Sequence, residues 1–138
     1  MAVLLIAEHN NNDLKAFTLN AATAASQIDG DLHAIIIGHN CGDASKKLSE
    51  LPVIKKVLSV DAPHYENFTA ENFAPVITKV AENYSHIVCS ANTFGKNLMP
   101  RIAAHLDISQ VSDIIKVISQ DTFLRPIYAG NAFATVKT

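Results

Sequence analysis

A lysine-bearing loop is the feature of this sequence whose residue types and spacing best suit binding an anion. The stretch "SANTFGKN" covers residues 90–97 and places Lys96 directly after Gly95. It begins at the end of "HIVCSA" (residues 86–91), an apolar run typical of a buried strand. In open α/β sheets, ligands bind beyond the carboxyl ends of the strands, and the first amides of the following helix favour anions. The candidate anion- or nucleotide-binding residues are Ser90, Asn92, Gly95, Lys96 and Asn97.

The same stretch is incomplete as a phosphate-binding loop. Such a loop has the pattern GxxxxGK[ST], whereas here one glycine precedes the lysine and Asn97 follows it. The chain contains no GxGxxG pattern. In a purely structural interpretation, Asn92 or Thr93 caps the next helix and Gly95 eases the turn. Lys96 is then a solvated charge, and the residues alone leave both interpretations open.

Other chemically capable side chains are scattered along the chain. Cys41 lies two residues from His39, but no base, orienting group and oxyanion donor can be assembled around it. Cys89 lies in an apolar run and is expected to be a buried, inert thiol. His33 and His39 could share a strand face, but six residues of strand separate them by about 20 Å, too far for one metal ion. We therefore predict no catalytic residue and no metal site.

The composition favours one soluble domain. The chain has 138 residues, of which 49% are apolar and 17% charged, and this length and composition allow a sizeable core without disulfides. A net charge of −2 gives no indication of nucleic-acid binding. The first apolar run lacks the basic flank of a signal peptide and the length of a membrane span. A cytoplasmic location is expected.

Apolar patterning predicts alternating strands and helices. Continuous or alternating apolar runs predict strands at residues 3–9, 32–38, 55–61 and 86–91. Helical spacing of apolar residues predicts helices within 14–28, 44–51 and 73–84. A fourth helix is expected after residue 97, beginning only near Leu98 or kinked there, because Pro100 disfavours helical geometry before it. This order is typical of a parallel sheet with helices on both faces, with the amphipathic third strand nearest an edge.

Hairpins replace helices after Asp107. Strands are expected at 112–119, 123–129 and 132–138, with a tight turn at Gly130–Asn131 and with Pro126 at an edge or a bulge. Aromatic and arginine side chains favour interfaces, so the interface candidates are Phe123, Arg125, Tyr128 and Phe133. The alternative is an ordinary edge hairpin with one packed face. Because the last expected strand reaches Thr138, we expect the chain to be part of a longer protein.

Several motifs resemble one known family. Residues 84–137 contain the pattern FGKN..PR.AA.LD, then SDI, then DTF.RPIYAGNA.ATVK. Together these motifs closely resemble the alpha subunit of electron transfer flavoproteins, and "VLLIAEHNNNDL" resembles the first strand of that subunit. The resemblance spans the whole chain.

The resemblance carries expectations about fold and function. It implies a three-layer αβα sandwich with a mostly parallel sheet, similar to adenine nucleotide alpha hydrolases, with core order 3-2-1-4-5 and C-terminal antiparallel hairpin strands. Residues 1–138 would be the N-terminal domain, and FAD would be held by a C-terminal domain beyond them. A beta subunit holding AMP would be the partner. Electrons would come from acyl-CoA and related dehydrogenases, as in fatty acid β-oxidation, and pass to a quinone oxidoreductase.

Two functions follow from these expectations. The first is a non-catalytic scaffold domain of an electron carrier, in which residues 90–97 are a lapsed version of the site that holds AMP in the sister subunit. The second is a stand-alone adenine-nucleotide-binding module that uses those residues. A small hydrolase has no support beyond its fold class.

Overall fold

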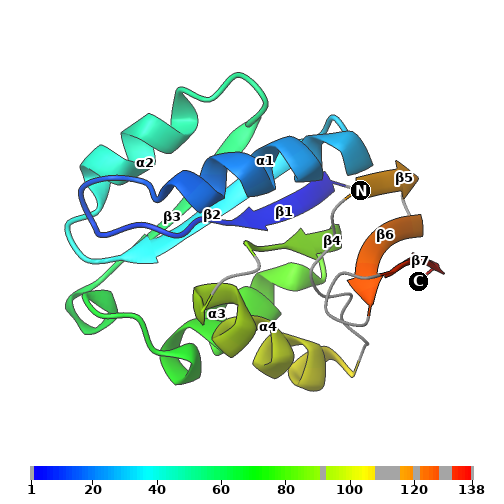
Figure 1. The fold of residues 1–138 in the computed structure, drawn as a ribbon. Coiled ribbons are helices and arrows are strands. Elements are labelled where there is room, and N and C mark those ends of the chain that lie inside the picture. Colours follow the sequence, from blue (N-terminus) through cyan, green and yellow to red (C-terminus); the bar gives the residue numbers. More distant parts are fainter. Residues whose placement is uncertain (1, 91–92, 108–115, 120–121, 128–131, 138) are drawn as a thin grey trace.

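The computed structural model describes residues 2–90, 93–107, 116–119, 122–127 and 132–137. Its central element is a four-stranded parallel sheet with the strand order β3-β2-β1-β4 (Figure 1). The strands are β1 (Ala2–Ile6), β2 (Leu32–Gly38), β3 (Lys56–Asp61) and β4 (Tyr84–Val88). All five residues of β1 are buried, whereas β3 contains only exposed and half-buried residues. The sequence therefore placed the amphipathic third strand correctly at an edge.

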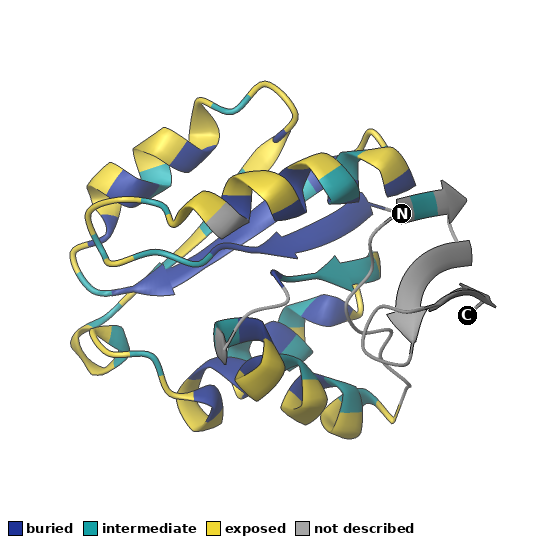
Figure 2. Ribbon diagram, viewed as in Figure 1, coloured by how far each residue is buried: buried dark blue, intermediate teal, exposed yellow. Residues whose placement is uncertain are grey.

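Helices cover both faces of this sheet, as Figures 1 and 2 show. They are α1 (Ala16–Ile28), α2 (Gly42–Ser49), α3 (Ala70–Ala81) and α4 (Thr93–Leu106), with a short 3-10 turn, η1 (Pro63–Tyr65). Each helix turns its buried residues toward the sheet and its exposed residues outward (Figure 2). The predicted three-layer αβα sandwich is confirmed.

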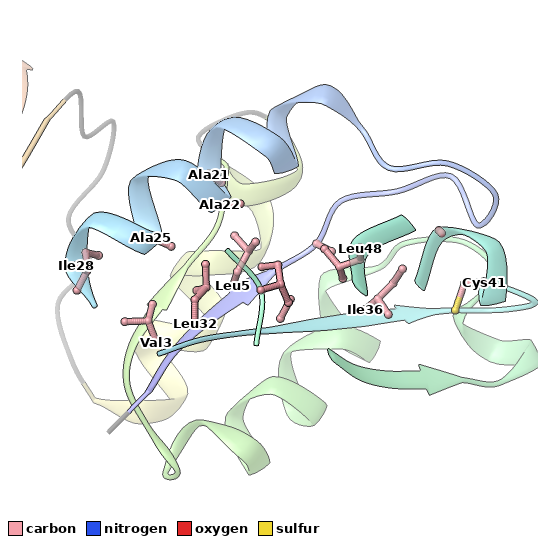
Figure 3. Packing of buried hydrophobic residues seen from close by; sticks show 14 residues of the cluster. Val3, Leu5, Ala21, Ala22, Ala25, Ile28, Leu32, Ile36, Cys41 and Leu48 are labelled. Atoms are coloured by element: carbon pink, nitrogen blue, oxygen red, sulfur yellow. The ribbon is translucent and has the colours of Figure 1, made fainter. Parts of the chain in front are cut away.

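The two faces of the sheet form two separate cores. Successive side chains of a strand point to opposite faces. Val3 and Leu5 of β1 therefore pack with α1 and α2, as Figure 3 shows. Leu4 and Ile6 pack with α3 and α4. Because a strand buried on both faces needs apolar residues at every position, β1 is a continuous apolar run.

Several element boundaries are shifted from the predicted ones, and two of these shifts have a structural cause. The strand expected at 86–91 begins at Tyr84, because Tyr84 pairs with Ala2 at the start of β1. The helix expected near Leu98 begins at Thr93, and Pro100 lies inside it. A proline in a helix forfeits one backbone hydrogen bond, but Leu98 and Ile102 are almost fully buried in the core and hold α4 against the sheet.

A second, antiparallel sheet follows. It contains β5 (Lys116–Ser119), β6 (Thr122–Ile127) and β7 (Ala132–Lys137) in that order, which confirms the change from helical crossovers to hairpins. The expected strand order 3-2-1-4-5 is correct for its first four strands. It is wrong for the fifth, because the described strand β5 pairs with β6 in the second sheet. Val117 of β5 packs against the core between the first sheet and α1. Two residues separate β5 from β6, a connection that suits antiparallel pairing and is far too short for a parallel crossover.

Pro126 also differs from its expected edge position. It lies in β6, the middle strand of the three, and its described pairing partner is Phe133 of β7. The described pairs between β5 and β6 reach only as far as Leu124, so they do not require an N–H from Pro126. The predicted turn at Gly130–Asn131 lies outside the described residues.

Candidate functional site

An open cleft lies where the chain leaves the carboxyl ends of β1 and β2. Its volume is about 310 Å³. We call it the switch-point cleft, because β1 is flanked by β2 on one side and β4 on the other, and ligands of open α/β sheets bind where strand order reverses in this way. Its lining residues are Glu8, His9, Asn11, Ile37, Tyr65, Glu66, Phe68, Phe73, Phe94 and Asn97.

His9 joins the ends of β1 and β2 at the edge of this cleft. Its Nδ1 accepts a hydrogen bond from the Asn11 backbone N–H at 2.9 Å. Its Nε2 lies 2.7 Å from the Ile37 carbonyl oxygen and must donate to it. Both ring nitrogens are therefore used by the neutral tautomer that carries its proton on Nε2. Burial lowers the pKa of His9, although the bond to the Ile37 carbonyl acts in the opposite direction.

Asn11 extends this framework across the cleft. Its side-chain Nδ2 donates to the Glu66 carbonyl at 3.0 Å, and its Oδ1 accepts the His39 backbone N–H at 3.0 Å. The Asn11 backbone is left-handed, with φ 74°, a conformation that asparagine tolerates. Gly38 makes the close approach possible, because a Cβ at Gly38 would lie 2.6 Å from both Asn11 Oδ1 and His9 Cε1. These hydrogen bonds join the loop after β1 to the loop after β2 and to the loop after η1.

Four aromatic rings form the apolar side of the cleft. Phe73 is buried, with 4% of its surface exposed, and Tyr65, Phe68 and Phe94 are half-buried around it. The Phe68 ring centroid lies 5.1 Å from that of Phe73 and 4.6 Å from that of Phe94. The Tyr65 and Phe73 rings lie 5.7 Å apart in an edge-to-face arrangement. Such edge-to-face pairs stabilise aromatic clusters beyond the area that they bury.

The five sequence-predicted residues do not converge on this cleft. Asn97 lines it, whereas Lys96 is exposed and lies outside its lining. Ser90 is buried at the end of β4, and a Cβ at Gly95 would lie only 1.8 Å from the Ser90 carbonyl oxygen. Asn92 lies outside the described residues. Gly95 therefore has a packing role beside Ser90.

Asp61 organises the loop between β2 and α2. Its Oδ1 accepts the Asn40 N–H at 2.9 Å, and its Oδ2 accepts the Cys41 N–H at 3.1 Å. These bonds, that from Asn40 first, lower the pKa of Asp61. His39 Nδ1 lies 3.7 Å from Asp61 Oδ1 and is not hydrogen-bonded. His39 is thus placed beside Asp61, and no described contact joins it to the Cys41 thiol.

The two thiols differ in exposure, since Cys41 is buried, whereas Cys89, which was expected to be buried, is half-buried. Cys41 is fully buried, and burial, followed by the nearby Asp61 charge, raises its pKa. Burial raises the pKa of Cys89 to about 12. A thiol with a raised pKa is protonated at neutral pH and is a poor nucleophile, which supports the prediction of an inert Cys89.

Neither a metal centre nor a membrane-spanning helix is found among the described residues. Among those residues, no group of three or more histidine, cysteine, aspartate or glutamate side chains is placed to hold a metal ion. None of the described helices is long and apolar enough to cross a membrane.

The sequence did not predict His9, Asn11 or the aromatic rings as site residues. Residues 9–11 carried no site prediction, although a histidine and an asparagine at the end of a buried strand are the signal for this end of the sheet. Phe73 was expected in a helix stripe. Tyr65 and Phe68 belong to a segment for which the sequence predicted neither a helix nor a strand.

The parallel sheet, the helices on both of its faces and the cleft at its switch point define a three-layer α/β domain, and comparison with known proteins identifies the family. The model of the electron transfer flavoprotein domain family matches residues 3–138, and the chain belongs to this family. The recognised resemblance to the alpha subunit is confirmed by the relatives, which carry that name.

Three relatives illustrate the match. The electron transfer flavoprotein subunit alpha of Pseudomonas aeruginosa is 48% identical over 138 residues, which are 100% of this chain and 45% of that protein. That of Bradyrhizobium diazoefficiens is 46% identical over 100% of this chain and 44% of its own length. The mitochondrial subunit of Dictyostelium discoideum is 43% identical over 98% of this chain and 40% of its own length. The chain thus spans less than half the length of these relatives.

Proposed function

We propose that this chain is the N-terminal domain of an electron transfer flavoprotein alpha subunit and acts as a non-catalytic scaffold within an electron carrier. The observation that carries this proposal is the family match over residues 3–138, together with relatives named as alpha subunits. FAD would be held by the portion of the protein that corresponds to the unmatched part of those relatives. Residues 1–138 would hold that flavin domain and a beta subunit in place.

The chemistry of the switch-point cleft supports a scaffold role. A dinucleotide pyrophosphate needs free backbone amides or cationic side chains. The cleft lining contains no lysine or arginine, and the polar groups of His9 and Asn11 are already hydrogen-bonded to the protein. FAD is therefore expected elsewhere, and AMP is expected in the beta subunit.

The second sheet supplies the proposed partner- or domain-facing surface. Phe123 and Arg125 lie in β6, and Phe133 lies in the neighbouring strand β7. We propose that these three residues, together with Tyr128, contribute to the contact with the beta subunit or the flavin domain, because aromatic and arginine side chains favour interfaces.

The resemblance also supplies the electron donors and acceptor. We propose acyl-CoA and related dehydrogenases as donors and a quinone oxidoreductase as acceptor. Electron transfer through FAD would be the property of the assembled protein.

Titration of the 138-residue chain with FAD tests the scaffold role. Flavin fluorescence and visible absorption would report binding. No association at micromolar FAD is expected. Micromolar binding followed by reduction of the bound flavin would contradict the proposal.

The second candidate function is an adenine-nucleotide-binding module, favoured by the position of Asn97 in the cleft. A thermal-shift experiment with AMP and ATP separates the two, because a ligand at 100 times its Kd stabilises a protein by about 2.7 kcal/mol. Absence of a shift with either nucleotide would exclude the module.

A further inference from the structure

The switch-point cleft carries a charge opposite to that of a nucleotide site. Glu8 and Glu66 are both among its lining residues, and no lysine or arginine is. His9 adds no positive charge at neutral pH, because its Nδ1 accepts a hydrogen bond and its pKa is lowered. Two acidic residues in the lining, without a lysine or an arginine among them, favour a cation over an anion.

The aromatic wall has the residue types that bind organic cations. Tyr65, Phe68 and Phe94 are half-buried residues of the cleft lining. Their arrangement around Phe73 includes ring planes inclined by 79° and 81°, so the rings are oriented in different directions. The electron-rich faces of aromatic rings attract ammonium groups, and several rings in different orientations can surround one.

The hydrogen-bonding capacity of the cleft points the same way. The Asn11 amide is committed through both its nitrogen and its oxygen. His9 uses both ring nitrogens. A phosphate would meet two acidic residues and no lysine or arginine in the lining, whereas a quaternary ammonium group has no N–H to satisfy and needs no acceptor.

We propose that the switch-point cleft binds a small organic cation of the quaternary ammonium class, with Phe68, Phe94 and Glu66 as its principal contacts. The cleft volume of about 310 Å³ is at the small end of ligand sites, which suits a compact cation. This inference is independent of the scaffold function, since a ligand could bind here whether or not the chain assembles with a flavin domain.

Choline and its uncharged isostere 3,3-dimethylbutan-1-ol provide the test, because they differ in one atom and in charge. Each would be titrated into the isotope-labelled chain and followed by two-dimensional NMR. Choline is expected to shift the amide signals around Phe68, Phe94 and Glu66, with an affinity roughly tenfold above that of the isostere. AMP is expected to leave these signals in place.

Variants distinguish the contribution of the aromatic ring faces to choline binding from that of apolar contact alone. Phe94→Leu keeps an apolar side chain but removes the ring, so it should bring the affinities for choline and the isostere within about twofold of each other. Glu66→Gln removes one exposed carboxylate and should weaken choline binding roughly threefold. Glu82→Gln, at the C-terminal end of α3 and outside the lining, is the control and should change nothing.

Three results would overturn the proposal. They are the absence of any shift with choline, equal affinity of the wild-type chain for choline and the isostere, and tighter binding of AMP than of choline. The Glu66→Gln variant keeps the test valid if Phe94→Leu fails to fold, because Glu66 is exposed and its carboxylate is not part of the core.

Discussion

Gly95 lies directly against the backbone of Ser90, so close that a Cβ on residue 95 would stand 1.8 Å from the Ser90 carbonyl oxygen. This contact joins the first turn of α4 to the end of β4. Gly95 gives the loop its likeness to a phosphate-binding motif, but its close packing against Ser90 is sufficient to explain why a glycine stands at this position.

Gly95→Ala should destabilise the fold. The added methyl group meets backbone that cannot rotate away, so we expect a loss of about 1–3 kcal/mol or more in the free energy of unfolding. Denaturant unfolding would measure it. Gly42→Ala is the matched control, because a Cβ there has nothing within 4 Å. Equal losses for both variants would contradict the close approach.

Asp61 should make stability sensitive to strong acid. The pKa of Asp61 is lowered below its ordinary value of 3.8, mainly by the backbone N–H groups of Asn40 and Cys41. The unfolded chain therefore takes up a proton before the folded chain does, so stability is lost as pH falls from about 3.8 through the folded pKa.

Asp61→Asn tests that assignment. The variant should be less stable than the wild type at neutral pH and should lose less stability in acid. Thermal unfolding at several pH values would measure both effects. Asp107→Asn, an exposed position with left-handed backbone that suits asparagine, should leave stability unchanged or slightly higher.

His9 should contribute a second, milder dependence on pH. Its folded pKa lies below the ordinary 6.5, mainly because it is buried. The unfolded state protonates first, so stability should fall as pH drops below about 6.5 towards the folded value. The difference between the wild type and His9→Gln isolates this residue from the other histidines. An identical pH profile for the two proteins would mean that His9 is not held in its neutral form.

Leu98→Ala should test the part of α4 that packs against the sheet. Leu98 is fully buried in the α3–α4 core, so truncation should cost about 2–5 kcal/mol. Val53→Ala, where the side chain is 37% exposed, should cost no more than about 0.5 kcal/mol. Chemical denaturation would compare them. A small loss at Leu98 would indicate that α4 does not pack as described.

The sequence predicted the framework well because burial on two faces leaves an unmistakable pattern. The strands at β1 and β2 are continuous apolar runs, and the amphipathic residues 55–61 became the edge strand. It predicted the start of α4 poorly, since the local preference of Pro100 was outweighed by the burial of Leu98 and Ile102.

The site was harder to predict, because its residues meet only through the fold. His9 depends on a carbonyl of β2 that is 28 positions away, and Asn11 depends on the Glu66 carbonyl 55 positions away. The location of the cleft, at the carboxyl ends of the strands, was predictable from the order of strands and helices. The pairing of those loops and the clustering of rings from η1, the loop after it, α3 and α4 have no signal in local spacing.

The most direct test of the scaffold function is isolation of the native protein that contains this sequence, using an antibody raised against residues 119–131. Its visible spectrum, subunit composition and FAD content would be measured together, with the 138-residue chain as reference. We predict a yellow complex of two different subunits that contains FAD, and a colourless reference chain. A colourless native protein without a second subunit would contradict the scaffold function and favour the nucleotide-binding module.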